Sequence, residues 1–469
     1  MSSTTRRSFV HAASSLAALS YVGRLRADDA KLPIAGIATS GTHIRQQIDG
    51  FGFSEAFHKA RGIQNLPATK RDELLNLMFS SSGMGYSILR NIIGAAPAGT
   101  GKGNGETPSI EPMPNEFQWD GDEDQIWLMN EAKKRGCTRF MSSVWSPPAW
   151  MKTGNSVIGG ELKPAMYQPF ADYLATYVLE YKKRFDLDIY AISPTNEPKF
   201  KASYDSTAWN GTQLKKFLRE NLIPTFAAKN VPAEILIDEQ NDWHDDTIND
   251  ILSDPACAKG IHIVAAHAYA STSAPYPDFS ARTGIFKTVN EMGKRIWETE
   301  VSAGDKNITN MNDGVYWARV VHTHLTEDNV SAWLYWWGTG ESDTRSQLVR
   351  LDLQAGTYQL SKRFFTIGHF ARYIRPGYHR VDATPSPVKN TFFSAYLDPT
   401  GKRLVCVAIN DDAVEHPFTI QPGDLKFATC TAVRTSSTET FSKQPPIVQT
   451  SGQWNVTTTP LSVTTFIFA

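Results

Sequence analysis

The feature that most constrains this chain is the regular alternation of short apolar runs and helix-like stretches between about residues 51 and 370. This pattern is typical of parallel strands joined by crossover helices. Eight strand candidates occur, near residues 50–52, 87–90, 139–145, 189–192, 235–239, 261–266, 295–297 and 332–337. Eight such units predict an α/β fold of the (β/α)8, or TIM, barrel type.

An open, doubly wound sheet is the alternative architecture. Such a sheet carries a glycine-rich phosphate-binding loop directly after its first strand. The glycine-rich segment 99–105 lies far from the first strand, and neither Ser nor Thr follows Lys102 as a P-loop requires. The sequence therefore favours the closed barrel.

The pattern changes at about residue 371. Helical periodicity stops, and short β-branched and aromatic runs separated by turn residues follow, at 391–396, 403–409, 428–434 and 462–468. This predicts an antiparallel β-sandwich as an attached side domain. We therefore expect a barrel at 51–370 and a side domain built from 31–50 together with 371–469.

The N-terminus has the features of an export signal. Arg6 and Arg7 precede a mildly apolar, Ala- and Ser-rich stretch, and a small residue, Ala27, offers a cleavage point. This arrangement predicts a twin-arginine signal over residues 1–27 and export to the periplasm or medium of a bacterium. An ordinary secretory signal and an amphipathic helix remain as alternatives.

Composition excludes several classes of protein. The chain has 41% hydrophobic and 20% charged residues, which suits a folded protein with a sizeable core. It has no apolar run long enough for a transmembrane helix. A net charge of −1 argues against nucleic-acid binding through a basic surface. The 12 Trp, 16 Tyr and 24 Phe residues suit a surface that stacks against sugar rings.

The four cysteines carry little functional signal. They have no Cys-x-x-Cys spacing, so a zinc site is not expected. Cys406 and Cys430 both fall in the β-rich region, and an oxidising compartment would allow them to pair. Whether they do so is left open by the sequence.

Two glutamates follow apolar strands at the expected catalytic face of the barrel. Glu197 lies in Asn196-Glu197-Pro198, and Glu300 ends the segment Trp297 to Glu300. Glu298 points the same way as Glu300 but lies about 7 Å lower along the strand. Two carboxylates on one face are what glycoside hydrolysis requires, one as an acid and one as a nucleophile or base. A structural salt bridge is the alternative for either residue taken alone.

Other residues at the strand ends could support these carboxylates. A buried arginine can hold a carboxylate in its ionised form. Tyr269 could hydrogen-bond the nucleophile and His267 a sugar hydroxyl, while the indoles could form the floor of the sugar subsites. The candidates for these roles are Arg90, Trp145, His267, Tyr269 and Trp336.

These segments together resemble glycoside hydrolase family 30, a family of retaining (β/α)8 glycosidases. The matching stretches are IDGFGFSEAF (48–57), SILRNIIGA (87–95), SVWSPPAWMKTGN (143–155), SPTNEP (193–198), AAHAYA (265–270), WETEVS (297–302), WLYWWG (333–338) and RYIRPG (372–377). The resemblance implies that Glu197 is the acid/base and Glu300 the nucleophile. It also implies supporting roles for Arg90, Asn196 and Tyr269.

Within that family, GFGFSEAF and WSPPAWMKT are more similar to the xylanase branch than to the others. The implied substrate is xylan, with β-1,6-glucanase and glucosylceramidase-like activity as alternatives. Lys59 and Arg61 could bind the anionic glucuronoyl groups of xylan, or simply begin a solvated helix.

We expect no cofactor, no metal and no nucleic-acid partner, and a monomer as the default state. A metal-dependent hydrolase is disfavoured because no strand-end His-x-His with further ligands is present. A non-catalytic carbohydrate-binding protein would need the loss of one carboxylate, and both are present here.

Overall fold

The structure is a computed structural model that describes residues 31–97, 107–200, 202–241, 243, 246–269 and 286–469. The chain divides into two units, Met1–Leu32 and Pro33–Ala469, and the described helices and strands lie in the second. The expected export signal at 1–27 and the glycine-rich segment 99–105 lie outside the described residues.

A closed barrel of parallel strands forms the catalytic half of this unit, as the alternating pattern predicts. Each strand pairs with the next in chain order, and β10 pairs with both β9 and β3 to close the ring. The strands are β3 (Gly50–Ser54), β4 (Ile88–Ile93), β5 (Arg139–Val144), β6 (Ile189–Ser193), β7 (Glu234–Gln240), β8 (Ile263–His267), β9 (Arg295–Glu300) and β10 (Ala332–Gly340). A hairpin of β11 (Gln347–Asp352) and β12 (Thr357–Leu360) adds to the outer edge of β10.

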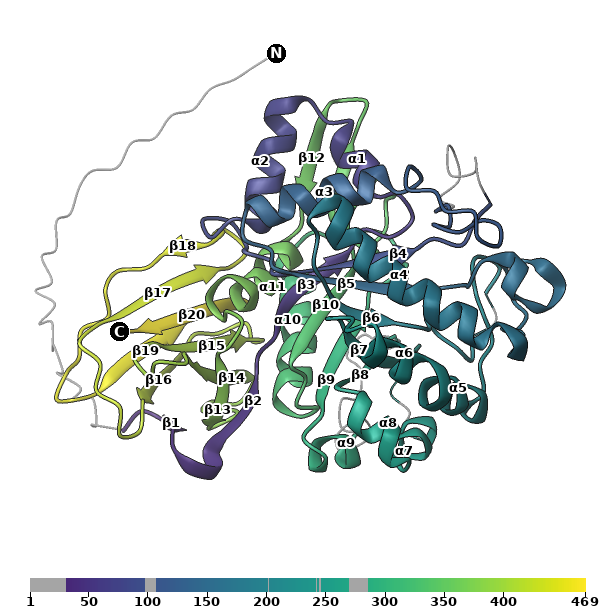
Figure 1. Cartoon of the computed structure of the whole chain (residues 1–469). Helices are drawn as coiled ribbons and strands as arrows, with labels where there is room; N and C mark the ends of the chain where they lie inside the picture. The colour runs from purple at the N-terminus through teal and green to yellow at the C-terminus, as the bar shows by residue number, and fades with distance from the viewer. Residues whose placement is uncertain (1–30, 98–106, 201, 242, 244–245, 270–285) are drawn as a thin grey trace, which may run out of the picture. The chain divides into compact units, whose positions relative to one another are not determined.

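Helices follow the barrel strands and cover them (Figure 1). In the longest, α4, apolar side chains recur every three or four residues on the buried face, and a left-handed residue, Asp186, ends the helix. The helices are α1 (Ala60–Gln64), α2 (Ala68–Phe79), α3 (Glu123–Lys134), α4 (Tyr167–Phe185), α5 (Gly211–Phe217), α6 (Ile223–Ala228), α7 (Asp246–Leu252), α8 (Pro255–Gly260), α9 (Lys287–Glu291), α10 (Met311–Thr326) and α11 (Lys362–Tyr373).

The inside of the barrel is a packed core. Side chains of alternate strands fill it, among them Met141, Leu236 and Trp297, all fully buried. Strands β3 and β4 come so close that a Cβ atom on Gly52 would lie 2.0 Å from the carbonyl oxygen of Ile88. The barrel interior therefore supports the rim mechanically and leaves no channel for substrate.

The side domain is a single ten-stranded sheet that curls until its two ends face one another. Its order is β18-β17-β20-β15-β14-β13-β1-β16-β19, with β2 also on β13. The ring centre of Phe418 on β16 lies 5.9 Å from that of Phe393 on β14 and 6.5 Å from that of Phe466 on β20. Rings from strands that are not neighbours in the sheet therefore share one core. The strands are β1 (Ile34–Ala38), β2 (Ile44–Gln47), β13 (His379–Ala383), β14 (Thr391–Leu397), β15 (Leu404–Asn410), β16 (His416–Gln421), β17 (Cys430–Thr435), β18 (Ser442–Lys443), β19 (Trp454–Thr458) and β20 (Ser462–Phe468).

This sheet has the predicted β-rich character, with one exception to its antiparallel pairing. Strand β1, from the N-terminal side of the barrel, pairs antiparallel with β13 but parallel with β16. Parallel pairing is possible here because β1 and β16 are far apart in the chain and need no hairpin between them.

Helices α10 and α11 lie between the barrel and the side sheet (Figure 1). The buried imidazole of His369 on α11 bridges the Thr465 and Thr435 hydroxyls of the sheet, at 2.8 and 2.9 Å. Arg319 on α10 forms an ion pair of 2.7 Å with Asp411. These polar contacts fix the side domain against the back of the barrel.

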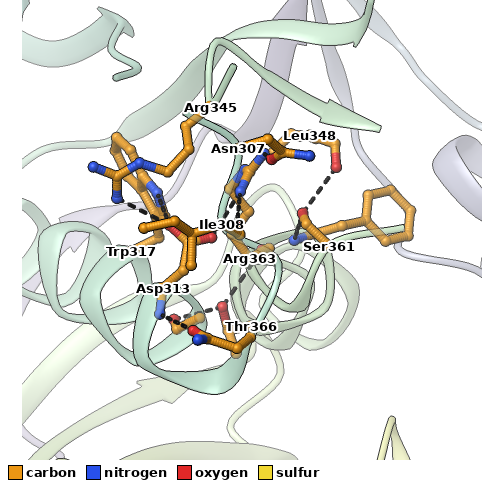
Figure 2. Close-up of polar contacts among 12 residues, drawn as sticks. Asn307, Ile308, Asp313, Trp317, Arg345, Leu348, Ser361, Arg363 and Thr366 are labelled. Atoms are coloured by element: carbon orange, nitrogen blue, oxygen red, sulfur yellow. Dashed lines mark hydrogen bonds and ion pairs between the residues drawn. The ribbon is translucent and has the colours of Figure 1, made fainter. Parts of the chain in front are cut away.

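A buried ionic cluster anchors the loops that follow β9 and β10 (Figure 2). The Asp313 carboxylate of α10 accepts hydrogen bonds from Arg363, Arg345 and the Trp317 indole at 2.7, 3.1 and 3.1 Å. Arg345 also forms two bonds, of 2.7 and 2.8 Å, with Asp305. The segment after Glu300 is thus tied to the loop after β10.

The four cysteines are free and buried. Cys406 on β15 pairs with Phe466 of β20, and Cys430 on β17 pairs with Phe468 of the same strand. Because β20 runs between them, the two thiols are too far apart to be bridged without moving the backbone. Among the described residues, the helices are too short or too polar to cross a bilayer.

Candidate active site

Glu197 and Glu300 come together at the carboxyl ends of the barrel strands. Glu300 is the last residue of β9, and Glu197 follows β6. One carboxylate oxygen of each lies within 4.8 Å of the other. The two side chains are almost buried, with residue exposures of 8% for Glu197 and 5% for Glu300. Both line the same cavity.

The backbone at Glu197 is in the left-handed region, with φ of 46°. This conformation is unusual for a residue with a side chain and persists only where neighbours enforce it. Here the Glu197 N–H donates to the Glu239 carbonyl of β7 at 2.8 Å, and the Phe200 N–H donates to the Glu197 carbonyl at 2.8 Å. The adjacent strand thereby fixes the direction of the Glu197 side chain.

Each oxygen of Glu300 has its own donor. Arg90 Nη1 donates to Oε2, and the Tyr269 hydroxyl donates to Oε1, both at 2.6 Å. Burial raises the pKa of Glu300, while the charges of His267 and Arg90 oppose that shift. The sequence-based expectation that Arg90 lowers this pKa was therefore incomplete. Burial also raises the pKa of Tyr269 well above its usual value, which keeps the hydroxyl a donor.

Glu298 lies one layer below Glu300 and is fully buried. Its carboxyl oxygens face the backbone N–H groups of Glu300 and Leu334, at 3.0 and 3.3 Å. Burial raises its pKa well above the usual range. Glu298 thus braces the strand ends from beneath, and Glu300 is the glutamate that reaches the cavity.

Arg90, on β4, links four elements at the centre of the site. In addition to Glu300, its guanidinium contacts Asn196 Oδ1 at 2.6 Å, Ser143 Oγ at 3.2 Å and Glu239 Oε1 at 2.9 Å. The side chain is fully buried. Arg90 and Asn196, for which the sequence predicts supporting roles in the site, both lie outside the cavity lining.

His267 ends β8 and is also fully buried. Its Nδ1 lies 3.0 Å from Glu197, and its Nε2 lies 3.7 and 3.8 Å from Glu239 and Glu300. Burial disfavours the charged imidazole, but these carboxylates raise the pKa of His267 to about 10. The sequence suggested that His267 binds a sugar hydroxyl. Its ring nitrogens instead face carboxylates, so they are not offered to a sugar.

Glu239 is the residue of the site that sequence reasoning missed. It follows Ile235–Ile237 on β7, so it ends an apolar strand in the same way as Glu197 and Glu300. Burial favours the neutral acid, but Arg90 and His267 lower the pKa of Glu239 to about 2. An ionised, fully buried carboxylate therefore faces both cations.

A cavity of about 910 Å³ opens above the two glutamates. Trp145 and Trp336, both predicted as site residues, line it with their ring centroids 6.0 Å apart. Phe57 packs edge-on against both, at 5.4 and 6.3 Å. The wall also includes Phe200, Tyr204, Tyr269 and Trp337. Such an aromatic wall around buried acids suits a ligand with apolar faces and polar edges.

Two cations also line this cavity. Lys59 Nζ lies 4.1 Å from the centre of the Trp337 ring, and Arg61 is the second residue of α1. Arg61 is 3.6 Å from Asp124, which also lies 2.8 Å from His58. Both cations thus lie on the β3–α1 side of the opening.

Glu197, His267 and Glu300 could in principle hold a metal ion, since their donor atoms lie within 4.8 Å of one another. However, both Glu300 oxygens accept hydrogen bonds from Arg90 and Tyr269. His267 and Arg90 also carry positive charge at this point. The donor set therefore fits proton transfer and nucleophilic attack better than cation binding.

Comparison with known proteins agrees with this geometry. The model of O-Glycosyl hydrolase family 30 matches residues 35–350. The catalytic domain of GH30 xylanase C from Talaromyces cellulolyticus superposes with a TM-score of 0.79, at 26% identity, over 93% of this chain and 100% of that one.

Two characterised relatives have different substrates in their names. The glucuronoxylanase XynC of Bacillus subtilis is 25% identical over 393 residues, covering 81% of this chain and 79% of that protein. The lysosomal acid glucosylceramidase of Mus musculus is also 25% identical, over 416 residues, covering 81% and 78%.

Proposed function

Because this chain belongs to O-glycosyl hydrolase family 30 and is a glycoside hydrolase, we propose that it cleaves β-linked xylan with retention of the anomeric configuration. The observation that carries the mechanism is the approach of the Glu197 and Glu300 oxygens to within 4.8 Å. Retaining enzymes place their carboxyl groups about 5–5.5 Å apart, whereas inverting enzymes leave about 6.5–9.5 Å for a water molecule.

The reaction proceeds in two displacements. Glu197 protonates the glycosidic oxygen while Glu300 attacks the anomeric carbon, so that a covalent glycosyl-enzyme forms and the leaving sugar departs. Glu197 then removes a proton from water, which attacks the same carbon and releases Glu300. Two inversions give net retention.

The neighbours of Glu300 support its role as nucleophile. Arg90 and Tyr269 hold its two oxygens in place, and the charge of Arg90 favours the ionised form against burial. An oriented carboxylate attacks without first losing rotational freedom, which is a large part of the rate advantage of an enzyme.

Xylan with glucuronoyl side groups is the proposed substrate class. The similarity to a glucuronoxylanase and to a GH30 xylanase supports this choice. Lys59 and Arg61 place two cations in the cavity lining, where an anionic side group would find charge-assisted hydrogen bonds.

A polysaccharide panel tests the proposal. Glucuronoxylan should be hydrolysed faster than unsubstituted xylan, and Lys59→Met with Arg61→Met should remove that preference while leaving the rate on unsubstituted xylan unchanged. Equal rates on both xylans for all variants would remove the glucuronoyl assignment. Products observed by NMR at early times should have the anomeric configuration of the substrate, and initial inversion would contradict the mechanism.

A glucosylceramidase-like β-glucosidase is the second candidate. The mouse glucosylceramidase matches as much of this chain as the bacterial xylanase does, at the same identity. Adding glucosylceramide and a β-1,6-glucan to the panel separates these substrates. Turnover of either, without hydrolysis of xylan, would replace xylan in the proposal and keep the two glutamates.

Export is part of the proposed function, since xylan is a polymer that the enzyme would encounter outside the cell. The proposal rests on Arg6 and Arg7 and on the mildly apolar stretch that follows them. Replacing both arginines with lysine should retain the enzyme in the cytoplasm of a bacterial host. Unchanged secretion would point to an ordinary secretory signal.

A further inference from the structure

A buried lysine outside the catalytic centre joins two of the loops that carry cavity residues. Lys152 has no exposed surface. Its Nζ donates to Ser146 Oγ at 2.8 Å, to the Val157 carbonyl at 3.1 Å and to the Ser206 carbonyl at 2.6 Å. Lysine is seldom fully buried, because removing its charge from water is costly unless several acceptors replace the water. Nothing in the proposed mechanism uses this group.

The three acceptors belong to segments that bear cavity residues. Ser146 directly follows Trp145 after β5, and Ser206 lies two residues beyond Tyr204 in the loop after β6. Trp145 and Tyr204 both line the cavity. Lys152 therefore lies between the loop that carries Trp145 and the loop that carries Tyr204.

Backbone hydrogen bonds continue this connection between the two loops. The Ser206 N–H donates to the Val157 carbonyl at 3.0 Å, and the Ala208 N–H donates to the Gly160 carbonyl at 2.8 Å. Ser206 Oγ also accepts from the Gly159 N–H at 3.0 Å. The ammonium group lies beside these bonds and binds the Val157 and Ser206 carbonyls together.

Glu197 itself is held from another direction. Its N–H is bonded to β7 through the Glu239 carbonyl, and its carboxylate lies 3.0 Å from His267. Removing the lysine should therefore loosen the aromatic walls more than it disturbs the acid. Burial lowers the pKa of Lys152 to about 8, and the negative charge of Asp205 opposes this shift.

We propose that Lys152 is a positioning residue that sets the affinity for substrate by fixing the loops of Trp145 and Tyr204. This inference rests on the proposed function only for the choice of substrate. The expected signature is a rise in KM with little change in kcat, because the carboxylates keep their own supports.

The test compares Lys152→Met with Lys163→Met, which removes a lysine from the same loop. Lys163 is half-buried and contacts the Trp150 carbonyl and Asn155 Oδ1, each at 3.1 Å, but none of the acceptors of Lys152. On xylan, Lys152→Met should raise KM about tenfold, equivalent to about 1.4 kcal/mol of binding, with kcat reduced less than about threefold. Lys163→Met should leave both constants near wild type.

A second readout does not depend on the substrate. Amide hydrogen exchange in segments 145–161 and 202–209 should become faster in Lys152→Met and stay unchanged in α10 and α11. If Lys152→Met does not fold, Ser146→Ala removes one acceptor and should raise KM about threefold in the folded enzyme. Unchanged KM and unchanged exchange would overturn the inference, and so would a loss confined to kcat. Failure of xylan hydrolysis by the wild type would refute the substrate and leave the exchange test intact.

Discussion

Arg90 Nη1 lies 2.6 Å from Glu300 Oε2, which joins β4 to β9 across the mouth of the barrel. The same guanidinium contacts Glu239, 2.9 Å away, so one buried cation is shared by two carboxylates. His267 adds a second cation that faces Glu197, Glu239 and Glu300. Glu197 and Glu300 therefore lie inside a network of buried charges, in which Arg90 and Tyr269 orient Glu300 and the nearby cations oppose the effect of burial on its pKa.

Glu197→Ala should remove the general acid while leaving the fold intact. Turnover of xylan should fall by about three orders of magnitude, since proton transfer to the leaving group typically contributes about 10²–10⁴-fold. An aryl glycoside with a good leaving group should lose less, and added azide should restore activity by attacking the glycosyl-enzyme. Steady-state kinetics with and without azide measure this. Wild-type rates on xylan would refute the role.

Glu239→Gln should reduce kcat about tenfold to a hundredfold, because Arg90 loses one of its two anionic partners and its orientation. Loss of that negative charge should also lower the pKa of Glu300 and move the acid limb of kcat/KM to lower pH. Glu234→Gln, at the half-buried start of the same strand, is the matched control. Equal changes in kcat and in the pH profile of the two variants would show that Glu239 does not act on Arg90 and Glu300 in the way proposed.

The charge of His267 predicts a particular dependence of stability on pH. Its folded pKa of about 10 lies above the ordinary value of 6.5, so its contribution is complete below about pH 6.5 and is lost as the pH rises through 10. Between pH 7 and 10 the thermal midpoint of the wild type should fall more steeply than that of His267→Gln. Identical slopes in scanning calorimetry would contradict the assigned charge.

Two aspartates that share Arg345, Asp313 and Asp305, should differ in their contribution to stability. Of the two, Asp313 is labelled in Figure 2. Asp313→Ala leaves Arg345 and the buried Arg363 without this partner and should cost about 3–5 kcal/mol of unfolding free energy. Asp305→Ala removes an aspartate whose side chain is 56% exposed, and it should cost less than about 1 kcal/mol. Urea unfolding measures both. Similar losses of unfolding free energy in the two variants would show that burial of the aspartate does not determine how much it stabilises the protein.

The barrel could be predicted from sequence because each of its strands is a short, continuous apolar segment, which is a local signal. The same local signal placed Glu197 and Glu300 at strand ends. Glu239 has that signal too, but its importance comes from Arg90, whose place beside it depends on the closure of the barrel. The roles of the two glutamates, and the domain boundaries, stay predictions.

Features that depend on several distant segments could not be predicted. The left-handed backbone at Glu197 is enforced by β7, and the pKa of His267 by carboxylates from three strand ends. Whether Cys406 can reach Cys430 depends on strand order, and β20 lies between them, so both remain free. The net shift at Glu300 depends on the balance between burial and nearby charge, which the residue pattern does not contain.

The most direct test is to trap the glycosyl-enzyme. Incubation with a 2-deoxy-2-fluoro xylobioside bearing a good leaving group should slow the second displacement, so that the leaving group departs and one 2-fluoroxylobiosyl group, of two sugar units, stays covalently attached to the protein. Peptide mass spectrometry should locate the label on Glu300, with Glu197 unmodified and no label on Glu300→Gln. A label on any other residue, or full turnover with no covalent species in an active enzyme, would contradict the assignment of Glu300 as the nucleophile.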